Sequence, residues 1–329
     1  MNGDERAMRA ARVRRFGPRA DALHLDDLAI PAPQPGEVVV RVRAAAVTPL
    51  DTYLRAGVAV GDYTPILPYT PGSAFAGIVA EIGAGVTDRV PGERVYGRTR
   101  SGAAAEWARC DAREVFPLPG RVDFADGAVV AVPFETAWWS LVDVAAARGG
   151  DVVLVQGAAG SVGAAAVQLA RAMGLHVIAT CAADDAARVR AHGAHAVIDF
   201  RDPHWTEAVR EASGGRGVDV VVEVAAATNL VADAALAAPG GRIVVVGGTG
   251  ATTIDPLVLI AKGLHVAGVD LRAIAPDRRA QIHAGIAAGL ENGTLRPHAA
   301  HRFALHEIVD AHGALEERRG AGGVVLVID

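Results

Sequence analysis

The middle of the chain alternates between apolar runs and helix-length segments, and this pattern constrains the fold more than any other feature. It begins at residues 152–174 with VVLVQGAAGSVGAAAVQLARAMG, a β-branched run followed by three glycines and good helix formers. Strands that alternate with helices of this length predict right-handed β-α-β units and a parallel sheet. The later apolar runs lie at 176–181, 196–199, 218–225 and 242–248, and a run at 264–271 would add a sixth strand.

A glycine-rich turn with the spacing G-x-x-G-x-x-G follows the first of these strands. Its position between a predicted strand and a predicted helix is the context expected of a dinucleotide-binding turn. The free N–H groups and the dipole at the start of the helix would hold a pyrophosphate. A tight turn without a ligand is the alternative, but the further β-α units favour the cofactor. The residues predicted to contact it are Gly157, Ala158, Gly160, Ser161, Val162 and Gly163.

The second strand ends at Thr180 and Cys181, without the acidic residue that binds the ribose diol of NAD. This leaves room for a 2′-phosphate, so we expect Thr180 to lie at the cofactor and NADPH to be preferred, with NADH not excluded. Arg188 or Arg190 would supply positive charge for the phosphate; that both are solvated helix residues is the alternative. Asp184 and Asp185 are expected at the start of the next helix, and close to the phosphate they would oppose NADPH.

Short strands and turns dominate the chain on both sides of the alternating region. Residues 37–47 and 76–83 are strand candidates, and the frequent turn signals suit a barrel-like or rolled sheet. A long helix is predicted at 276–292, where it ends at Asn-Gly. The tail resembles the first part, so the chain is expected to leave one domain, build a second and return. The predicted divisions are 1–124, 125–270 and 271–329.

Composition narrows the function classes. Hydrophobic residues make up 51% of the 329 residues, so a sizeable core is expected. The net charge of −5 disfavours a nucleic-acid partner. Cys110 and Cys181 are too few for a disulfide framework or a multi-cysteine zinc site. The N-terminus lacks the apolar core of a signal peptide, and glycines interrupt the longest uncharged run, so a cytoplasmic protein without a membrane partner is predicted.

Beyond the glycine turn, several motifs occur in an order that resembles the zinc-free quinone oxidoreductase branch of the medium-chain dehydrogenase/reductase superfamily, which includes zeta-crystallin. The resemblance extends from about residue 8 to residue 329, so it is more specific than any single motif. The motifs are TPLDTYLRAG at 48–57, LPYTPGSAFAGIVAEIG at 67–83, PGERVYG at 91–97, VPFETAW at 132–138, GVDVVVEVA at 217–225, GGRIVVVGG at 240–248 and GAGGVVLVID at 320–329.

This resemblance implies an α/β protein in which a GroES-like, β-rich catalytic domain is joined to a Rossmann domain with a doubly wound parallel sheet. It implies an active site between the domains, NADPH as hydride donor, and a quinone or an α,β-unsaturated carbonyl compound as acceptor. A homodimer is also implied. The zinc-dependent branch needs a His-Glu pair where this chain has PGSAF, so no metal is expected.

Several residues are candidates for the reaction itself. Tyr53 and Thr48 are the hydroxyls predicted to face the acceptor carbonyl, and Tyr63 is predicted to line the acceptor pocket. Tyr53 as a core aromatic and Thr48 as a turn residue are the alternatives. Thr136 matches the family position beside the nicotinamide, with a helix cap as the alternative. Gly247, Gly248 and Thr249 follow a predicted strand, where open α/β sheets bind ligands, and an ordinary turn is the alternative.

Four positions depart from the family pattern. Thr48 stands where Asn is usual, Ala74 where an acid is common, Asp185 near a usual Lys, and Val324 where Lys or Arg is common. The predicted function is NADPH-dependent reduction of a quinone or an enone. The alternatives are a pathway-dedicated reductase of one bulky natural-product enone, or a non-catalytic cofactor-binding member.

Overall fold

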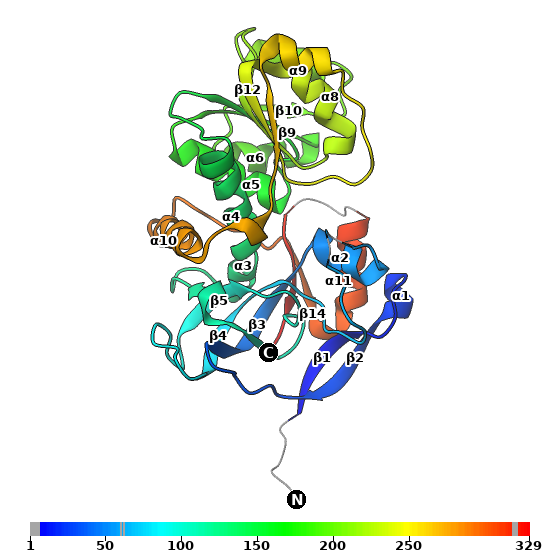
Figure 1. Ribbon diagram of the computed structural model, residues 1–329, viewed down its shortest axis with the longest axis vertical. Helices are drawn as coiled ribbons and strands as arrows, with labels where there is room; N and C mark the ends of the chain where they lie inside the picture. Colours follow the sequence, from blue (N-terminus) through cyan, green and yellow to red (C-terminus); the bar gives the residue numbers. More distant parts are fainter. Residues whose placement is uncertain (1–6, 60, 62, 318–321) are drawn as a thin grey trace, which may run out of the picture. The chain divides into compact units, whose positions relative to one another are not determined.

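The computed structural model describes residues 7–59, 61, 63–317 and 322–329, and the chain divides into two compact units (Figure 1). The first unit consists of Met1–Val132 and Pro297–Asp329, and the second unit of Pro133–Arg296. These divisions differ from the predicted ones at 124/125 and 270/271. The chain thus leaves the first unit once and returns to it near its end.

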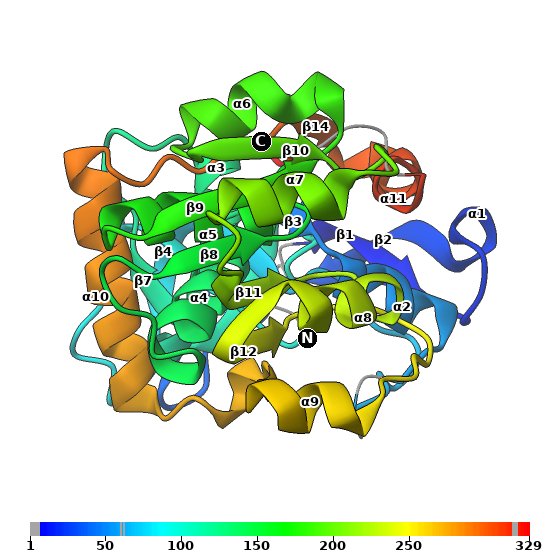
Figure 2. The same cartoon turned by 90° about the horizontal axis from the view of Figure 1, so that it is seen from above.

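A six-stranded parallel sheet forms the centre of the second unit (Figure 2). The order of its strands is β10-β9-β8-β11-β12-β13, which is the doubly wound order of a Rossmann fold. The predicted fold class and the sixth strand are therefore confirmed. The strands are β8 (Val152–Val155), β9 (His176–Cys181), β10 (Ala196–Asp199), β11 (Val218–Glu223), β12 (Ala237–Val245) and β13 (His265–Gly268).

The central strands of this sheet consist mainly of buried aliphatic residues. Val153, Leu154 and Val155 of β8 are fully buried, and so are Val220 and Val221 of β11. Such continuous apolar runs are typical of parallel strands that are covered on both faces. The segments that surround the sheet are η2 (Trp139–Val144), α5 (Ser161–Ala172), η3 (Ala183–Asp185), α6 (Ala186–Ala191), α7 (Trp205–Ala212), α8 (Ala226–Leu236), α9 (Pro256–Lys262), η4 (Leu271–Ala273) and α10 (Pro276–Asn292).

The first unit contains a seven-stranded sheet in which β3 pairs with β4, β6 and β15. Because β15 lies near the C-terminus, its antiparallel pairing with β3 joins the end of the chain to its beginning. A separate hairpin consists of β1 (Ala7–Val13) and β2 (Leu23–Ala29). The sheet strands are β3 (Glu37–Val47), β4 (Ala74–Ile82), β5 (Arg94–Arg98), β6 (Trp107–Asp111), β7 (Val115–Pro117), β14 (His301–Ala304) and β15 (Val324–Val327).

Short helical segments pack around this sheet. The helix α2 begins after Thr48 and ends at Gly57, which adopts a left-handed conformation with φ of 85°. The side chain of Asp123 caps α3 by accepting a hydrogen bond from the amide of Asp126. The helical segments are α1 (Arg19–Ala22), α2 (Pro49–Ala56), η1 (Ala112–Glu114), α3 (Phe124–Ala128), α4 (Ala131–Trp138, which crosses the division at 132/133), η5 (Leu305–Glu307) and α11 (Ile308–Glu316).

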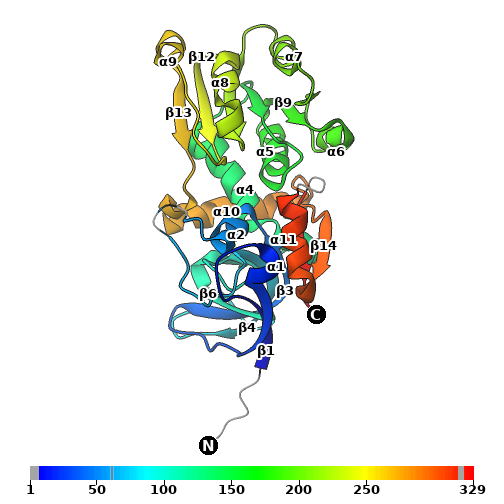
Figure 3. The ribbon, with the colours of Figure 1, turned by 90° about the vertical axis from the view of Figure 1, so that its right-hand side faces the viewer.

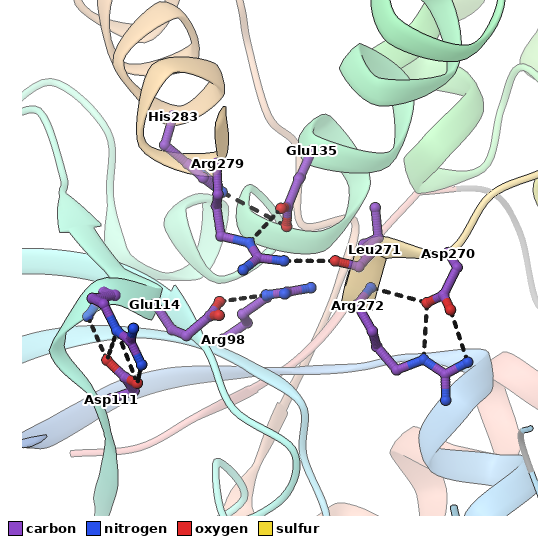
Figure 4. A network of polar contacts seen from close by, with 10 residues as sticks. Arg98, Asp111, Glu114, Glu135, Asp270, Leu271, Arg272, Arg279 and His283 are labelled. Atoms are coloured by element: carbon purple, nitrogen blue, oxygen red, sulfur yellow. Dashed lines mark hydrogen bonds and ion pairs between the residues drawn. The ribbon is translucent and has the colours of Figure 1, made fainter. Parts of the chain in front are cut away.

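The helix α10 belongs to the second unit, whereas the predicted division at 270/271 assigns it to the returning part of the chain. Arg279 of α10 donates from Nε to Glu135 Oε1 of α4 at 2.7 Å, and both side chains are buried (Figure 4). Arg279 also donates to the carbonyl of Leu271. Gly285 contacts α4 so closely that an added Cβ would lie 2.4 Å from the Trp138 ring. A buried ion pair between helices distant in sequence leaves no sign in the local pattern.

No helix among the described residues is both long enough and apolar enough to cross a membrane.

Candidate functional site

The glycine turn of the second unit follows β8 and leads into α5. Gly157 has a φ of 61°, and an added Cβ would lie 2.7 Å from the Val224 side chain. A Cβ at Gly163 would lie 2.4 Å from the carbonyl oxygen of Gly157. At Gly160 the nearest such contact would be 3.4 Å, which is ordinary packing. Gly157 and Gly163 are therefore required by the turn itself, whereas Gly160 leaves open space beside it.

Hydrogen bonds divide the amides of this turn into two groups. The amide of Ala158 donates to the Thr180 carbonyl at 2.8 Å, and the amide of Gly160 donates to the Gly157 carbonyl at 3.0 Å. The helix α5 has no side-chain cap, so its first amides lack a partner within the helix. These amides carry the positive end of the helix dipole and form a site for an anion. They belong to Ser161, Val162 and Gly163.

A chain of buried polar side chains lies beneath the turn. The Thr180 hydroxyl donates to Gln156 Oε1 at 2.5 Å and accepts a hydrogen bond from the Gly157 amide at 3.3 Å. Gln156 Nε2 donates to Asp233 Oδ1 at 2.9 Å. The neighbouring Glu223 carboxyl group raises the pKa of Asp233. Gln156, Thr180, Glu223 and Asp233 are all at most 2% exposed.

This polar chain lies where the order of the strands reverses. Gln156 follows β8, and Glu223 is the last residue of the neighbouring strand β11. The sheet continues through β9 and β10 on the β8 side and through β12 and β13 on the β11 side. Ligands of open α/β sheets bind at the carboxyl ends of the strands at such a reversal of the strand order. Gly247 and Gly248 follow the next strand, and the Gly247 carbonyl accepts a hydrogen bond from the Ala226 amide. Thr249 is exposed.

The end of β9 carries the residues predicted to choose between NADPH and NADH. Thr180 is 1% exposed and its hydroxyl proton is already donated to Gln156, so its side chain faces the core. Arg188 donates from Nη2 to Asp185 Oδ1 at 2.8 Å, and both side chains are partly exposed. Burial, together with Asp185 and Asp199, raises the pKa of the Cys181 thiol to about 11. The positive charge of Arg188 is therefore balanced by a neighbouring acid.

Thr136 lies within α4, and the helix-cap alternative for it was wrong. The Thr136 carbonyl accepts a hydrogen bond from the Ser140 hydroxyl at 2.7 Å. Ser140 lies in the π-helical segment that continues α4 from Trp139 to Val144. Such π-helical turns often occur at functional sites.

In the first unit, Thr48 caps the helix α2 together with Asp51. The Thr48 hydroxyl donates to Asp51 Oδ2 at 2.6 Å, and the Thr48 amide donates to the same oxygen at 2.8 Å. Ser73 lies 3.3 Å from the Thr48 hydroxyl. Burial raises the pKa of Asp51 to about 6, with hydrogen bonds from Thr48, Gly72 and Ser73 opposing the effect. Asp51 is thus ionised at neutral pH, and the Thr48 proton is directed to it.

Tyr53 and Tyr63 are both half-buried in the first unit. Tyr53 lies on α2, and its hydroxyl has no hydrogen-bond partner among the residues that the structure describes. Tyr63 packs against the hydrophobic core, in the loop that leads to β4. Tyr69 is 7% exposed, and burial raises the pKa of its hydroxyl. Tyr53 therefore offers a free donor at a partly exposed position.

Charged residues join α2 to α11 and to the loop at Gly17. Arg55 forms an ion pair with Glu316 of α11 and donates to the Gly17 carbonyl at 3.1 Å. Glu316 also pairs with Arg19 at 2.9 Å. His312 is 1% exposed, and burial and the two arginines lower the pKa of its imidazole to about 3. These contacts fix the helix that carries Tyr53 against the C-terminal helix.

Comparison with known proteins assigns both units to one family. Residues 34–120 match the family described as "Alcohol dehydrogenase GroES-like domain", and residues 161–285 match "Zinc-binding dehydrogenase". A quinone oxidoreductase of Sus scrofa is 36% identical over 326 residues, which cover 98% of each chain. The chain belongs to the zeta-crystallin-like quinone oxidoreductase branch of the medium-chain dehydrogenase/reductase superfamily. It is thus an oxidoreductase of this superfamily.

Solved structures of this superfamily resemble the chain over nearly its whole length. An NAD-dependent alcohol dehydrogenase has a TM-score of 0.90 and 31% identity, with 98% of this chain and 100% of that chain covered. A mycobacterial protein solved in complex with NADPH has a TM-score of 0.87 and 28% identity, with 97% of this chain and 99% of that chain covered. The first of these proteins is thus described with NAD and the second with NADPH.

Zinc, which the name of one matching family includes, does not fit the residues of this quinone oxidoreductase homologue. Within the described ranges, no group of three or more His, Cys, Asp or Glu side chains could hold a metal ion. Cys110 is buried in β6, and burial raises the pKa of its thiol.

Sequence reasoning missed the buried polar chain of this family member. Glu223 follows three valines at the end of β11, Gln156 follows the apolar strand β8, and Asp233 interrupts an apolar stretch of α8. Each was a single polar residue in an apolar run, which is a usable signal because buried polar groups need partners. Their mutual contact was not predictable, since the three residues lie on separate elements.

Proposed function

We propose that the chain is an NADPH-dependent, zinc-independent oxidoreductase that transfers a hydride to a quinone or an α,β-unsaturated carbonyl compound. The observation that carries this proposal is the glycine turn of the second unit. It combines two sterically required glycines, an uncapped helix start and a position at the reversal of the strand order. These features suit a pyrophosphate. Relatives described as quinone oxidoreductases over their full length support the acceptor class.

In the proposed site, the amides of Ser161, Val162 and Gly163 bind the pyrophosphate. Because Gly160 has no side chain, the pyrophosphate is able to approach the backbone there, while Gly157 and Ala158 shape the turn. A bound nicotinamide supplies the hydride, so the protein needs to position the acceptor and exclude water. Thr136 and the segment of Gly247, Gly248 and Thr249 are proposed contacts of the cofactor.

The proposed donor to the acceptor oxygen is Tyr53. Its hydroxyl is free among the described residues, whereas the Thr48 hydroxyl donates to Asp51. A donor aimed at the oxygen on which negative charge develops stabilises that charge. Thr48 then acts by capping α2 and by fixing Asp51, and Tyr63 is a proposed wall of the acceptor pocket.

NADPH is proposed over NADH for two reasons. The strand β9 ends without an acidic residue, and Arg188 of the following helix α6 supplies a positive charge. The structure of a relative in complex with NADPH supports this choice. The Asp185 carboxylate beside Arg188 weakens the preference, and a measurable affinity for NADH follows.

A homodimer is proposed to form through the edge of the second unit's sheet. The edge strand β13 and the helix α9 lie on the same side of the second unit (Figure 3). They expose Leu257, Ile260 and Val266, whose exposed fractions are 68%, 74% and 42%. Apolar side chains beside an open strand edge favour pairing with a second chain.

The test is turnover of purified protein with NADPH and two acceptors, a small quinone and a bulky enone, at matched concentrations. The proposal expects acceptor-dependent oxidation of NADPH that survives treatment with a metal chelator. Turnover of the bulky enone alone would favour the pathway-dedicated reductase. Absence of turnover with both acceptors, despite tight NADPH binding, would favour the non-catalytic cofactor-binding alternative.

A further inference from the structure

Glu223 and Asp233 form a pair of carboxyl groups buried beneath the glycine turn. Both side chains are fully buried, at 0% exposure. Glu223 Oε2 and Asp233 Oδ2 are buried without a hydrogen-bond partner among the described residues, and the two carboxyl groups lie close enough for Glu223 to raise the pKa of Asp233. Their remaining oxygens accept hydrogen bonds, Glu223 from the Ala225 amide and Asp233 from Gln156 Nε2. We refer to these two side chains as the carboxyl pair.

One proton must lie within the carboxyl pair if its two groups are to attract each other. Two buried carboxylates would repel without a cation between them, and a carboxyl group that donates to a carboxylate removes this repulsion. Burial and the neighbouring Glu223 raise the pKa of Asp233 to about 9. Glu223 is the acidic neighbour that raises the pKa of Asp233, and the hydrogen bond from Gln156 opposes this increase.

The elements packed against α8 carry other charged side chains, which have partners of their own. Lys262 of α9 donates to the carbonyls of Ala234, Ala235 and Ala237 at 2.7–3.0 Å. Arg242 of β12 pairs with Asp151 at 2.8 Å. None of these groups contributes to the shift of Asp233. The charged residues of α7, which also packs against α8, are Glu207, Arg210 and Glu211.

The orientation of one amide links the carboxyl pair to the turn. Because Asp233 accepts from Gln156 Nε2, the amide oxygen of Gln156 faces Thr180 and accepts its hydroxyl proton. The Thr180 oxygen is then free to accept the Gly157 amide. Each donor in this series has one acceptor, so a reversal of the Gln156 amide would place its oxygen against Asp233 Oδ1, acceptor against acceptor.

We propose that the carboxyl pair shares one proton and thereby, through Gln156 and Thr180, holds the glycine turn in the form that receives the dinucleotide. Asp233 and Glu223 are positioning residues, since neither touches the ligand. Loss of the shared proton to solvent leaves two buried charges that repel each other and disturb the Gln156 amide. This inference rests on the proposed function, because its effect is read on dinucleotide binding.

The test compares NADPH affinity between pH 8 and pH 10 in the wild type and in Asp233→Asn. The substituted side chain keeps an acceptor for Gln156 and a donor for Glu223, but it does not titrate. With a pKa near 9, the protonated fraction falls about tenfold over this range, so the wild-type Kd should rise roughly tenfold. The variant should show little change. Glu223→Gln replaces the other carboxyl group of the pair with an amide and should give the same flat profile.

Asp219→Asn is the matched control. Asp219 lies on β11, the strand of Glu223, but it pairs with Arg216 away from the glycine turn. It should keep the wild-type pH profile. The same profile in the wild type, Asp233→Asn and Glu223→Gln would overturn the proposal. Melting temperatures at each pH separate the alternatives, since a purely stabilising pair would change stability and leave the Kd of the folded protein constant.

A second readout does not need the cofactor. Amide hydrogen exchange of the segment 156–163, corrected for the chemical effect of pH, should rise above pH 9 in the wild type and not in Asp233→Asn. If the wild type binds neither NADPH nor NADH at pH 8, the proposed function fails. The exchange experiment then still tests the proposed role of the carboxyl pair. Equal exchange in the wild type and in Asp233→Asn would overturn that role.

Discussion

Arg188 Nη2 donates to Asp185 Oδ1 at 2.8 Å, so the cation predicted to recognise the cofactor phosphate is held by an acid one turn away. Removal of that acid should free Arg188. We expect Asp185→Ala to increase the affinity for NADPH relative to NADH by about threefold, the scale of an exposed ion pair. Calorimetric titration with both cofactors measures the ratio. Asp184→Ala, at an exposed position, is the control and should leave it unchanged. An unaltered ratio in Asp185→Ala would show that Arg188 does not meet the phosphate.

The hydroxyl of Tyr53 should matter to the chemical step. We expect Tyr53→Phe to lower kcat by about 10²-fold, because a donor to the developing anion is removed, and to leave NADPH affinity unchanged. Steady-state kinetics and a separate binding titration distinguish the two effects. Tyr69→Phe is the matched control, since its buried hydroxyl has no hydrogen-bond partner among the described residues. Equal activity of both variants would remove Tyr53 from the proposed site.

Two glycines of the turn should respond differently to alanine. A Cβ at Gly163 would lie 2.4 Å from the Gly157 carbonyl oxygen, whereas a Cβ at Gly160 would meet nothing closer than 3.4 Å. Gly163→Ala should lower the melting temperature by several degrees, which for a domain of this size corresponds to about 1–3 kcal/mol of overpacking. Gly160→Ala should preserve stability and weaken NADPH binding. A destabilised Gly160→Ala, or unimpaired binding by it, would contradict the assignment.

Acid should destabilise the first unit through His312. Burial and Arg55 lower the folded-state pKa of His312 to about 3, below the ordinary value of 6.5. The unfolded chain therefore binds more protons below pH 6.5, and stability falls as the pH falls toward 3. Between pH 7 and pH 5 the loss is on the order of 2 kcal/mol. Urea denaturation should show this loss in the wild type and a smaller one in His312→Gln. The exposed His306→Gln is the control, and an equal loss in all three would exclude His312.

The exposed apolar side chains of α9 and β13 should mediate self-association. Ile260→Asp places a charge at a position 74% exposed in one chain and should convert a dimer to a monomer by light scattering. Ile66→Asp, 90% exposed in the first unit, should leave the dimer intact. Monomeric wild type, or a dimer insensitive to Ile260→Asp, would contradict this interface.

The sequence predicted those elements whose patterns are local. The strand at 37–47 and the helix at 276–292 have the predicted bounds, because a β-branched run and an Asn-Gly stop identify them. Other boundaries depend on strand pairing: α8 ends at Leu236 because β12 begins at Ala237, which pairs with Val218. The helix α9 was missed, although Asp255 and Pro256 form a readable start signal.

The site was predictable in part for the same reason. The glycine turn is contiguous, so one stretch of sequence was enough to predict its position and to propose its role. The hydrogen bond from Thr48 to Asp51, the pairing of Arg188 with Asp185 and the carboxyl pair depend on side-chain orientation. Residue types alone indicate candidates for such contacts, but packing decides which donor meets which acceptor.

The most direct test of the central claim is a calorimetric titration of the wild-type protein with NADPH and, separately, with NADH. The account predicts saturable binding of one NADPH per chain, tighter than NADH, and loss of this binding in Gly163→Ala. Binding of neither dinucleotide would contradict the assignment of the turn that joins β8 to α5.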